Sequence, residues 1–177
     1  ITGALDLDGA ATNLSTLSVS TTSNLGADVT TSSTQTYSGA VTLSGADRTL
    51  PGSTVNFGST VNGGTNALII TGALDLDGAA TNLSTLSVST TSNLGADVTT
   101  SSTQTYSGAV TLSGADRTLT GSTVNFGSTL AGGTNGLTIT GNLDLDGAAT
   151  GLTTLSVSGT SNLGADVTTS STQTYSG

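Results

Sequence analysis

The residue types best suited to chemistry are pairs of aspartates in the string LDLDG: Asp6/Asp8, Asp75/Asp77 and Asp144/Asp146. If the leucines point inward along a strand, both carboxylates of a pair project outward on one strand face, ~7 Å apart. Carboxylates suit calcium, but an EF-hand loop needs more oxygens and a closing Glu, and glycine-rich calcium solenoids carry tandem GGxGxD. Neither pattern occurs, so the alternative is a solvated acidic stripe that keeps the surface soluble and blocks lateral sheet pairing.

The sequence lacks most of the residue types that enzymes use for catalysis. The chain has no His, Cys, Lys or Glu, and its only cations are Arg48 and Arg117. The usual nucleophile–base pairs need one of the missing types. The arginines occupy equivalent repeat positions and are interpreted as structural, with Arg48 beside Asp47 in an exposed, weak ion pair with Asp28. We therefore expect no enzyme, no catalytic, cofactor-binding or metal-binding residue, and no cofactor.

The charge balance narrows the range of partners. All eleven acidic residues are Asp, and the net charge is −9. Nucleic acid and anionic lipid are poor partners for such a chain, because phosphate binding needs Lys and Arg. No run of about 18 apolar residues occurs, so we expect no membrane insertion by this segment.

A long repeat organises the whole chain. The string ITGALDLDG begins at Ile1 and again at Ile70, and ITGNLDLDG begins at Ile139, so the copies are evenly spaced. Residues 1–69 and 70–138 differ at five positions, and residues 139–177 begin a third copy. The sequence therefore predicts one continuous array of two repeats and a partial third, and we expect it to be a section of a longer array.

Each repeat contains smaller units marked by Asx and Gly corners. The Asx markers are Asp28, Asp47, Asn66, Asn82 and Asp97, which follow one another at nearly regular intervals. The Gly markers are Gly39, Gly58, Gly78 and Gly95. Asx residues tolerate left-handed backbone, and Gly leaves room for a neighbouring coil. Both series predict about four coils per repeat, with Asp28, Asp47 and Asn66 stacked over one another.

Between these corners, apolar and polar residues alternate over short runs, as at Val41/Leu43 and Leu74/Leu76. Alternation of this kind is typical of strands with one buried face, and Gly, Thr, Ser and Asn are weak helix formers. The pattern predicts an all-β parallel β-solenoid with Tyr37 and Phe57 pointing inward. The alternative is one immunoglobulin-like sandwich per repeat, although such domains usually have a larger aromatic core.

Three strings carry a family resemblance: TQTYSGAVTL from Thr34, GADRTLTGSTVNFGSTL from Gly114 and GLTITGNLDLDG from Gly136. They resemble repeats of large bacterial surface and secreted proteins related to filamentous haemagglutinin. That resemblance implies a right-handed parallel β-helix, export across the outer membrane, and a role as a long adhesin, biofilm component or surface fibre.

Two functions remain open at this point. In the first, the repeats form a structural extracellular shaft that projects a distal tip or builds a filament. In the second, their Ser/Thr/Asn faces bind glycans or sister fibres. The partners of this interpretation are neighbouring repeats, other copies end to end or side by side, and surface glycans. Ice binding needs the same Thr pair on every coil. The dense Thr run at Thr30–Thr36 is expected on only one coil in four, which argues against ice binding.

Overall fold

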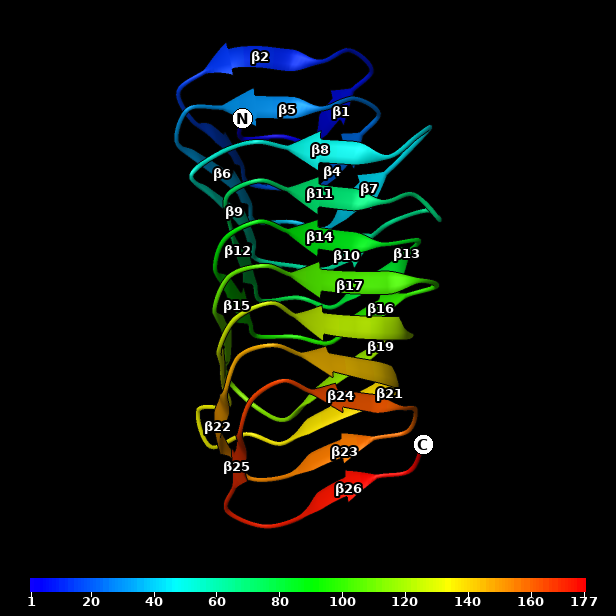
Figure 1. Cartoon of the computed structure of the whole chain (residues 1–177). Coiled ribbons are helices and arrows are strands. Elements are labelled where there is room, and N and C mark those ends of the chain that lie inside the picture. The colour runs from blue at the N-terminus through cyan, green and yellow to red at the C-terminus, as the bar shows by residue number, and fades with distance from the viewer.

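The computed structural model describes residues 1–177 as an all-β rod with its termini at opposite ends (Figure 1). The chain winds in stacked coils, and every pair of strands is parallel. The predicted parallel β-solenoid is confirmed. An immunoglobulin-like sandwich is excluded, because its sheets are antiparallel.

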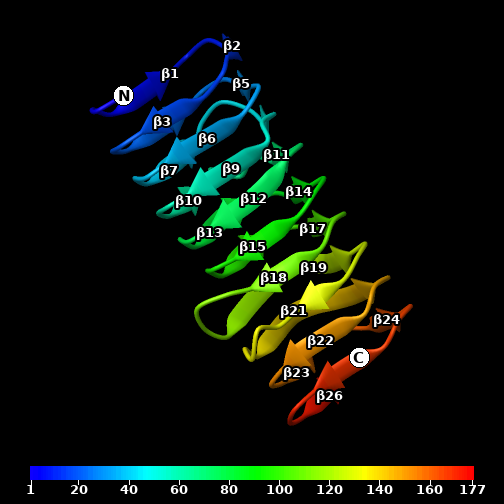
Figure 2. The ribbon, with the colours of Figure 1, turned by 90° about the vertical axis from the view of Figure 1, so that its left-hand side faces the viewer.

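Each coil has three strands, which stack on those of the coils above and below to form three faces (Figures 1 and 2). The first face contains β1 (Leu5–Leu7), β4 (Ser23–Leu25), β7 (Val41–Leu43), β10 (Val61–Asn62), β13 (Ala80–Leu83), β16 (Val98–Thr100), β23 (Leu155–Val157) and β26 (Gln173–Tyr175). The second face contains β2 (Ala11–Leu14), β5 (Val29–Thr31), β8 (Arg48–Leu50), β11 (Leu68–Ile70), β14 (Leu86–Val88), β17 (Thr103–Tyr106) and β24 (Ser161–Leu163). The third face contains β3 (Leu17–Val19), β6 (Thr34–Tyr37), β9 (Thr54–Phe57), β12 (Ala73–Leu76), β15 (Ser92–Leu94), β18 (Val110–Leu112), β20 (Leu130–Ala131), β22 (Ala149–Leu152) and β25 (Val167–Thr169).

Two long strands, β19 (Arg117–Phe126) and β21 (Leu137–Leu145), run through the corner between the first and second faces. Each contributes one segment to both faces, so the 26 strands form 28 segments, or nine coils and one strand of a tenth. The coils differ in length: the one from Leu5 to its register partner Ser23 is shorter than the one from Val98 to its register partner Leu119.

The long repeat does not contain a whole number of coils. The TQTY string forms β6 on the third face, its copy forms β17 on the second face, and its third copy forms β26 on the first face. Eleven segments separate successive copies, which at three segments per coil gives three and two-thirds coils. The predicted number of about four coils is this value rounded, and the remaining third shifts each repeat by one face.

The interior is one hydrophobic cluster of 35 buried residues that runs along the rod. It follows from the strand alternation, because residues at every second position point inward. Tyr37 and Phe57 are both fully buried and stack with ring centroids 5.5 Å apart, which confirms their predicted inward positions. Tyr106 and Phe126 repeat the same stack.

The Gly markers lie where the chain turns from the third face to the first. Gly39, Gly58, Gly78 and Gly95 occupy this corner on four consecutive coils, as predicted. At Gly78 an added Cβ would lie 2.2 Å from the carbonyl carbon of Ser59, in the coil before it. The corner therefore requires glycine there, because the neighbouring backbone leaves no space for a side chain.

Candidate functional site

The first aspartate of each LDLDG string belongs to a ladder of polar side chains along one face. Asp75, half-buried on β12, accepts hydrogen bonds from Asn56 of β9 at 2.9 Å and from Asn93 of β15 at 2.8 Å. One donor comes from the coil before and the other from the coil after, and each bonds a different carboxylate oxygen. Charge-assisted bonds of this kind are stronger than neutral ones, so Asp75 links three successive coils.

The same ladder appears in the other copies, at the same repeat positions. Asp144 accepts from Asn125 and Asn162, each at 2.8 Å. Asp6 accepts from Asn24 at 2.8 Å. The strings VNF, LDL and SNL are therefore three consecutive rungs of one structural unit, a relation that their separation along the sequence conceals.

The second aspartate of each string does not share the strand. β1 ends at Leu7 and β12 ends at Leu76, so Asp8 and Asp77 lie at the corner beyond the strand end. The prediction that both carboxylates lie on one strand face is wrong, because the chain turns before the glycine. No group of three or more carboxylates is close enough to hold a metal ion. Calcium takes six to eight oxygens, and both oxygens of Asp75 already accept amide hydrogens.

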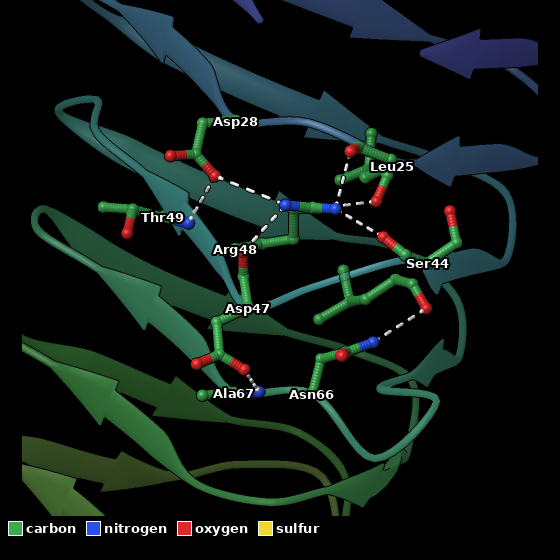
Figure 3. A network of polar contacts seen from close by, with 10 residues as sticks. Leu25, Asp28, Ser44, Asp47, Arg48, Thr49, Asn66 and Ala67 are labelled. Carbon is green, nitrogen blue, oxygen red and sulfur yellow. Dashed lines mark hydrogen bonds and ion pairs between the residues drawn. The ribbon is translucent and has the colours of Figure 1, made fainter. Parts of the chain in front are cut away.

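The Asx corner between the first and second faces has the predicted stack (Figure 3). Asp28 accepts the backbone N–H of Thr49 at 3.0 Å, one coil further on. Asp47 likewise accepts the N–H of Ala67 at 2.8 Å. Asn66, in the coil after them, donates to the carbonyl of Gly63 at 3.0 Å. Each aspartate therefore satisfies a backbone donor of the next coil, which confirms the predicted stacking of these three residues.

The ladder of Asx markers breaks at Asn82. This residue lies inside β13 on the first face, where its side chain donates to Asn62 at 3.1 Å. Extending the stack to Asn82 is wrong, because the repeat is one-third of a coil short of four. Asn82 has a positive φ of 54°, and Gly151 at the equivalent position has a φ of 66°. Left-handed backbone favours Asn and Gly, which explains why each copy has one of these two residue types at this position.

Arg48 contradicts the prediction of an exposed ion pair. It is only 6% exposed and points inward from β8, where its register partner is Leu68. Its guanidinium donates to four backbone carbonyls: Leu25 at 2.8 Å, Asp47 at 2.8 Å, Gly26 at 2.6 Å, and Ser44 (Figure 3). Asp28 lies 4.0 Å away and is the only carboxylate within reach of it.

Arg48 therefore stabilises the corner between the first and second faces. An arginine presents five N–H groups, and those of Arg48 bind the carbonyls at both ends of the turn Ser44–Asp47 and two carbonyls of the coil before it. Arg117 repeats the arrangement with the carbonyls of Leu94, Ser113 and Asp116. The sequence contained the signal for this role, since Arg48 and Leu50 have the i, i+2 spacing of inward residues.

A second buried polar group lies beside the aromatic stack. Gln35 is fully buried; its amide donates to the carbonyls of Val29 at 2.9 Å and Pro51 at 2.7 Å, and its oxygen accepts the hydroxyl of Tyr37 at 2.9 Å. Burial raises the pKa of Tyr37 above its usual value. Gln104 and Tyr106 repeat this pair. The TQTY string thus encodes an internal polar link between coils, which alternation alone did not reveal.

Only one surface hollow, of about 420 Å³, includes members of these polar groups, Asp144 and Asn162 of the ladder. One hollow of about 210 Å³ is formed by Thr65, Asn82, Leu83, Thr99, Thr100 and Ser101, and its counterpart in the next repeat has the same volume. Their walls are hydroxyl, amide and aliphatic groups without a carboxylate or a cation. They lie where the strand containing the left-handed residue bulges against its neighbour.

Comparison with known proteins gives no family: no family model, no curated protein and no solved structure matches this chain significantly. The structure contains no helix that is long and apolar enough to cross a membrane. What the geometry defines is the architectural class, a parallel β-solenoid in which Asp–Asn ladders, arginines and buried glutamines bond to neighbouring coils.

Proposed function

We propose that this chain is part of the repetitive shaft of an extracellular bacterial adhesin or surface fibre, which projects a distal tip or builds a filament. The observation that carries the proposal is the stack of parallel coils around one core. The bacterial surface location and the adhesin role rest on the resemblance of the repeats to filamentous haemagglutinin-like proteins.

The direction of the hydrogen bonds suits a shaft. The chain has 106 backbone–backbone hydrogen bonds, and even those outside the strands commonly join residues one coil apart, such as the bond from the N–H of Ser38 to the carbonyl of Val19 at 2.9 Å. Because these bonds lie along the rod axis, stretching the rod loads them directly. Asn–Asp–Asn ladders and the buried arginines add side-chain bonds in the same direction.

The spacing of coils also makes length a simple function of repeat number. Neighbouring strands lie ~4.8 Å apart, so three and two-thirds coils add ~18 Å per repeat. Since each coil contacts only its neighbours, repeats add length without changing the contacts of those already present.

The test has two measurements on arrays of two, four and six repeats. Small-angle scattering should give rods that lengthen by ~18 Å per repeat at constant cross-section. Cell-adhesion and glycan-array assays on the same arrays should show no saturable binding. Rods of constant length, or a globular form, would refute the shaft.

The second candidate function, binding of glycans or sister fibres by the repeats themselves, draws on the recurrent hollows beside Asn82 and Gly151. Saturable glycan binding would favour it, provided that Thr99→Trp, which places a large side chain at the exposed wall of the hollow, abolishes the signal. The matched control is Thr111→Trp, which changes an exposed threonine outside any hollow.

A further inference from the structure

Two asparagines of the chain are followed directly by glycine: Asn62–Gly63 in the first repeat and Asn135–Gly136 in the second. The equivalent positions of the other copy are Asn66–Ala67 and Ala131–Gly132, so neither pair is repeated. Asparagine is a chemically labile residue. A following glycine leaves the asparagine side chain open to attack by the next backbone nitrogen, because no Cβ stands in the way.

The side-chain oxygen of Asn62 accepts two hydrogen bonds. One comes from the backbone N–H of Gly64 and the other from the amide of Asn82 in the next coil, each at 3.1 Å. Attack by the nitrogen of Gly63 on the side-chain carbonyl carbon moves negative charge onto this oxygen, where two N–H groups stabilise it. Asn62 is exposed, and its amide nitrogen makes no hydrogen bond within the chain, so this nitrogen is free to leave into solvent.

The amide of Asn135 is held in the opposite way. Its nitrogen donates to backbone carbonyls, among them those of Leu112 at 3.3 Å and Gly132 at 2.9 Å, and the residue is half-buried. Its oxygen accepts no hydrogen bond within the chain. Charge on that oxygen therefore has no donor beside it, and the nitrogen must break its hydrogen bonds before it can leave.

The attacking nitrogens of the two sites are both restrained. The N–H of Gly63 donates to the carbonyl of Thr81 at 2.8 Å, and the N–H of Gly136 donates to the carboxylate of Asp116 at 2.7 Å. Each bond must open before attack, and the bond to the charged acceptor is the stronger of the two. The nucleophile and the amide that it attacks therefore favour the same site.

We propose that Asn62 is a site of spontaneous deamidation in the folded rod and that the fold protects Asn135. The nitrogen of Gly63 bonds to the side-chain carbonyl carbon of Asn62, and the Cγ–Nδ2 bond breaks. The proton of the Gly63 N–H passes through water to the leaving nitrogen, which departs as ammonia. Water then opens the cyclic imide at one of its two carbonyls, which yields aspartate or isoaspartate at position 62.

Either product adds one negative charge beside Asn82. Isoaspartate also adds one carbon to the main chain at the end of β10, so the register of Asn62 with Thr81 cannot be kept. The first repeat therefore contains an ageing site that the second, with Ala131 at the same position, lacks. This chemistry belongs to the chain itself and holds whether the rod is a shaft or a binding module.

The test incubates the full chain in mildly alkaline buffer and follows both sites by mass spectrometry. Trypsin cleaves only after Arg48 and Arg117, so the two Asn–Gly pairs fall in separate peptides, residues 49–117 and 118–177. Asn62 should convert at least ~10-fold faster than Asn135, less than the effect of a donor in an enclosed oxyanion hole because Asn62 is exposed. Equal rates would overturn the proposal. A faster Asn135 would also overturn it, and would indicate that Asp116 acts as a base.

Incubation in urea shows whether the fold causes the difference. The two rates should converge in urea, because the hydrogen bonds that distinguish the sites are gone. A ratio that persisted there would mean that neighbours along the sequence set it, which would contradict the proposal.

Two variants assign the signal and its cause. Asn82→Gly removes one donor to Asn62 at a position where the third copy has Gly151 with the same left-handed backbone, so the fold should be kept. Conversion of Asn62 should slow several-fold, and an unchanged or faster rate would refute the role of the two donors. In Asn62→Ala, which introduces the residue type of the second copy, the signal in residues 49–117 should vanish. A signal that remained would belong to another asparagine and would refute the assignment.

Discussion

Two stretches of identical sequence, residues 92–106 and 161–175, differ in their surroundings. In the first, Leu94 and Tyr106 are both fully buried. In the second, their copies Leu163 and Tyr175 are 43% and 36% exposed. β15 pairs with a strand on each side, whereas β24 pairs only with β21.

The local hydrogen bonds of the two stretches are nevertheless the same. Tyr106 donates to Gln104 at 3.0 Å, and Tyr175 donates to Gln173 at 2.9 Å. What the second stretch lacks is a contact with a following coil, such as the bond from Gln104 to the carbonyl of Thr120 at 2.8 Å. The sequence of a coil therefore sets its shape, and burial depends on the coils on both sides, as in repeat proteins generally.

The largest expected effect separates Gly72 from its copy Gly3. A Cβ at Gly72 would lie 1.9 Å from the carbonyl oxygen of Gly52, while at Gly3 nothing lies within 4 Å. Gly72→Ala should lower the free energy of unfolding by more than ~4 kcal/mol, because two backbones must move apart, and Gly3→Ala should change it by less than ~0.5 kcal/mol. Denaturant titration measures both. Equal effects would show that the coils do not approach as closely as the structure has them.

A smaller difference is expected between the two leucines of the compared stretches. Leu94→Ala removes a fully buried side chain and should cost ~2–5 kcal/mol. Leu163→Ala removes one that is already partly in water, so its cost should be well below half of that. The same denaturant titration compares them. A cost at Leu163 that matched the cost at Leu94 would mean that burial does not explain the stability of the stack.

The sequence predicted the stack from features that recur once in each coil. Asp28, Asp47 and Asn66 lie one coil apart, and so do the four Gly markers. The near-regular spacing of each series therefore indicated the length of one coil. It could not place Asn82, because matching that residue to the same column assumes a whole number of coils per repeat. The number of faces is set by how corners pack in three dimensions, and no residue type encodes it.

The buried polar groups were missed for a different reason. Arg48 was expected to be exposed, and Gln35 was assigned no role, because charged and amide side chains are mostly exposed. Their inward direction was visible in the alternation with Leu50 and Tyr37, but most of the carbonyls that they satisfy belong to other coils or to other segments of their own coil. Those acceptors become neighbours only when the coils stack.

The tyrosine–glutamine pair provides a third comparison. Tyr106→Phe leaves the oxygen of Gln104 buried without its donor and should cost ~1–3 kcal/mol. In Tyr175→Phe the exposed Gln173 can bond to water, so the change should be a fraction of that value. Thermal unfolding of both variants at neutral pH checks the difference, and a neutral Tyr106→Phe would indicate that the buried oxygen finds another donor.

Alkaline pH should also distinguish the buried Tyr106 from the partly exposed Tyr175. Burial raises the pKa of Tyr106 far above the ordinary value of ~10. Below pH ~10 the hydroxyl is protonated in both states and stability is unaffected; above it the unfolded chain releases a proton that the folded chain keeps, so stability falls by up to ~1.4 kcal/mol per pH unit for this group. Unfolding measured between pH 9 and 11 should show a shallower decline in Tyr106→Phe than in Tyr175→Phe. Parallel curves would contradict the role of burial.

The smallest expected effect is a gain in stability. The hydroxyl of Ser92 is buried on the third face without a hydrogen-bond partner, between the register partners Leu74 and Val110. Ser92→Ala removes this unsatisfied group and should raise the free energy of unfolding by ~1 kcal/mol. The exposed Ser89→Ala is the control, with no change expected. If Ser92→Ala destabilised the rod, its hydroxyl would have to bond a group inside the stack, and the interior of the coil would be less apolar than its strand neighbours indicate.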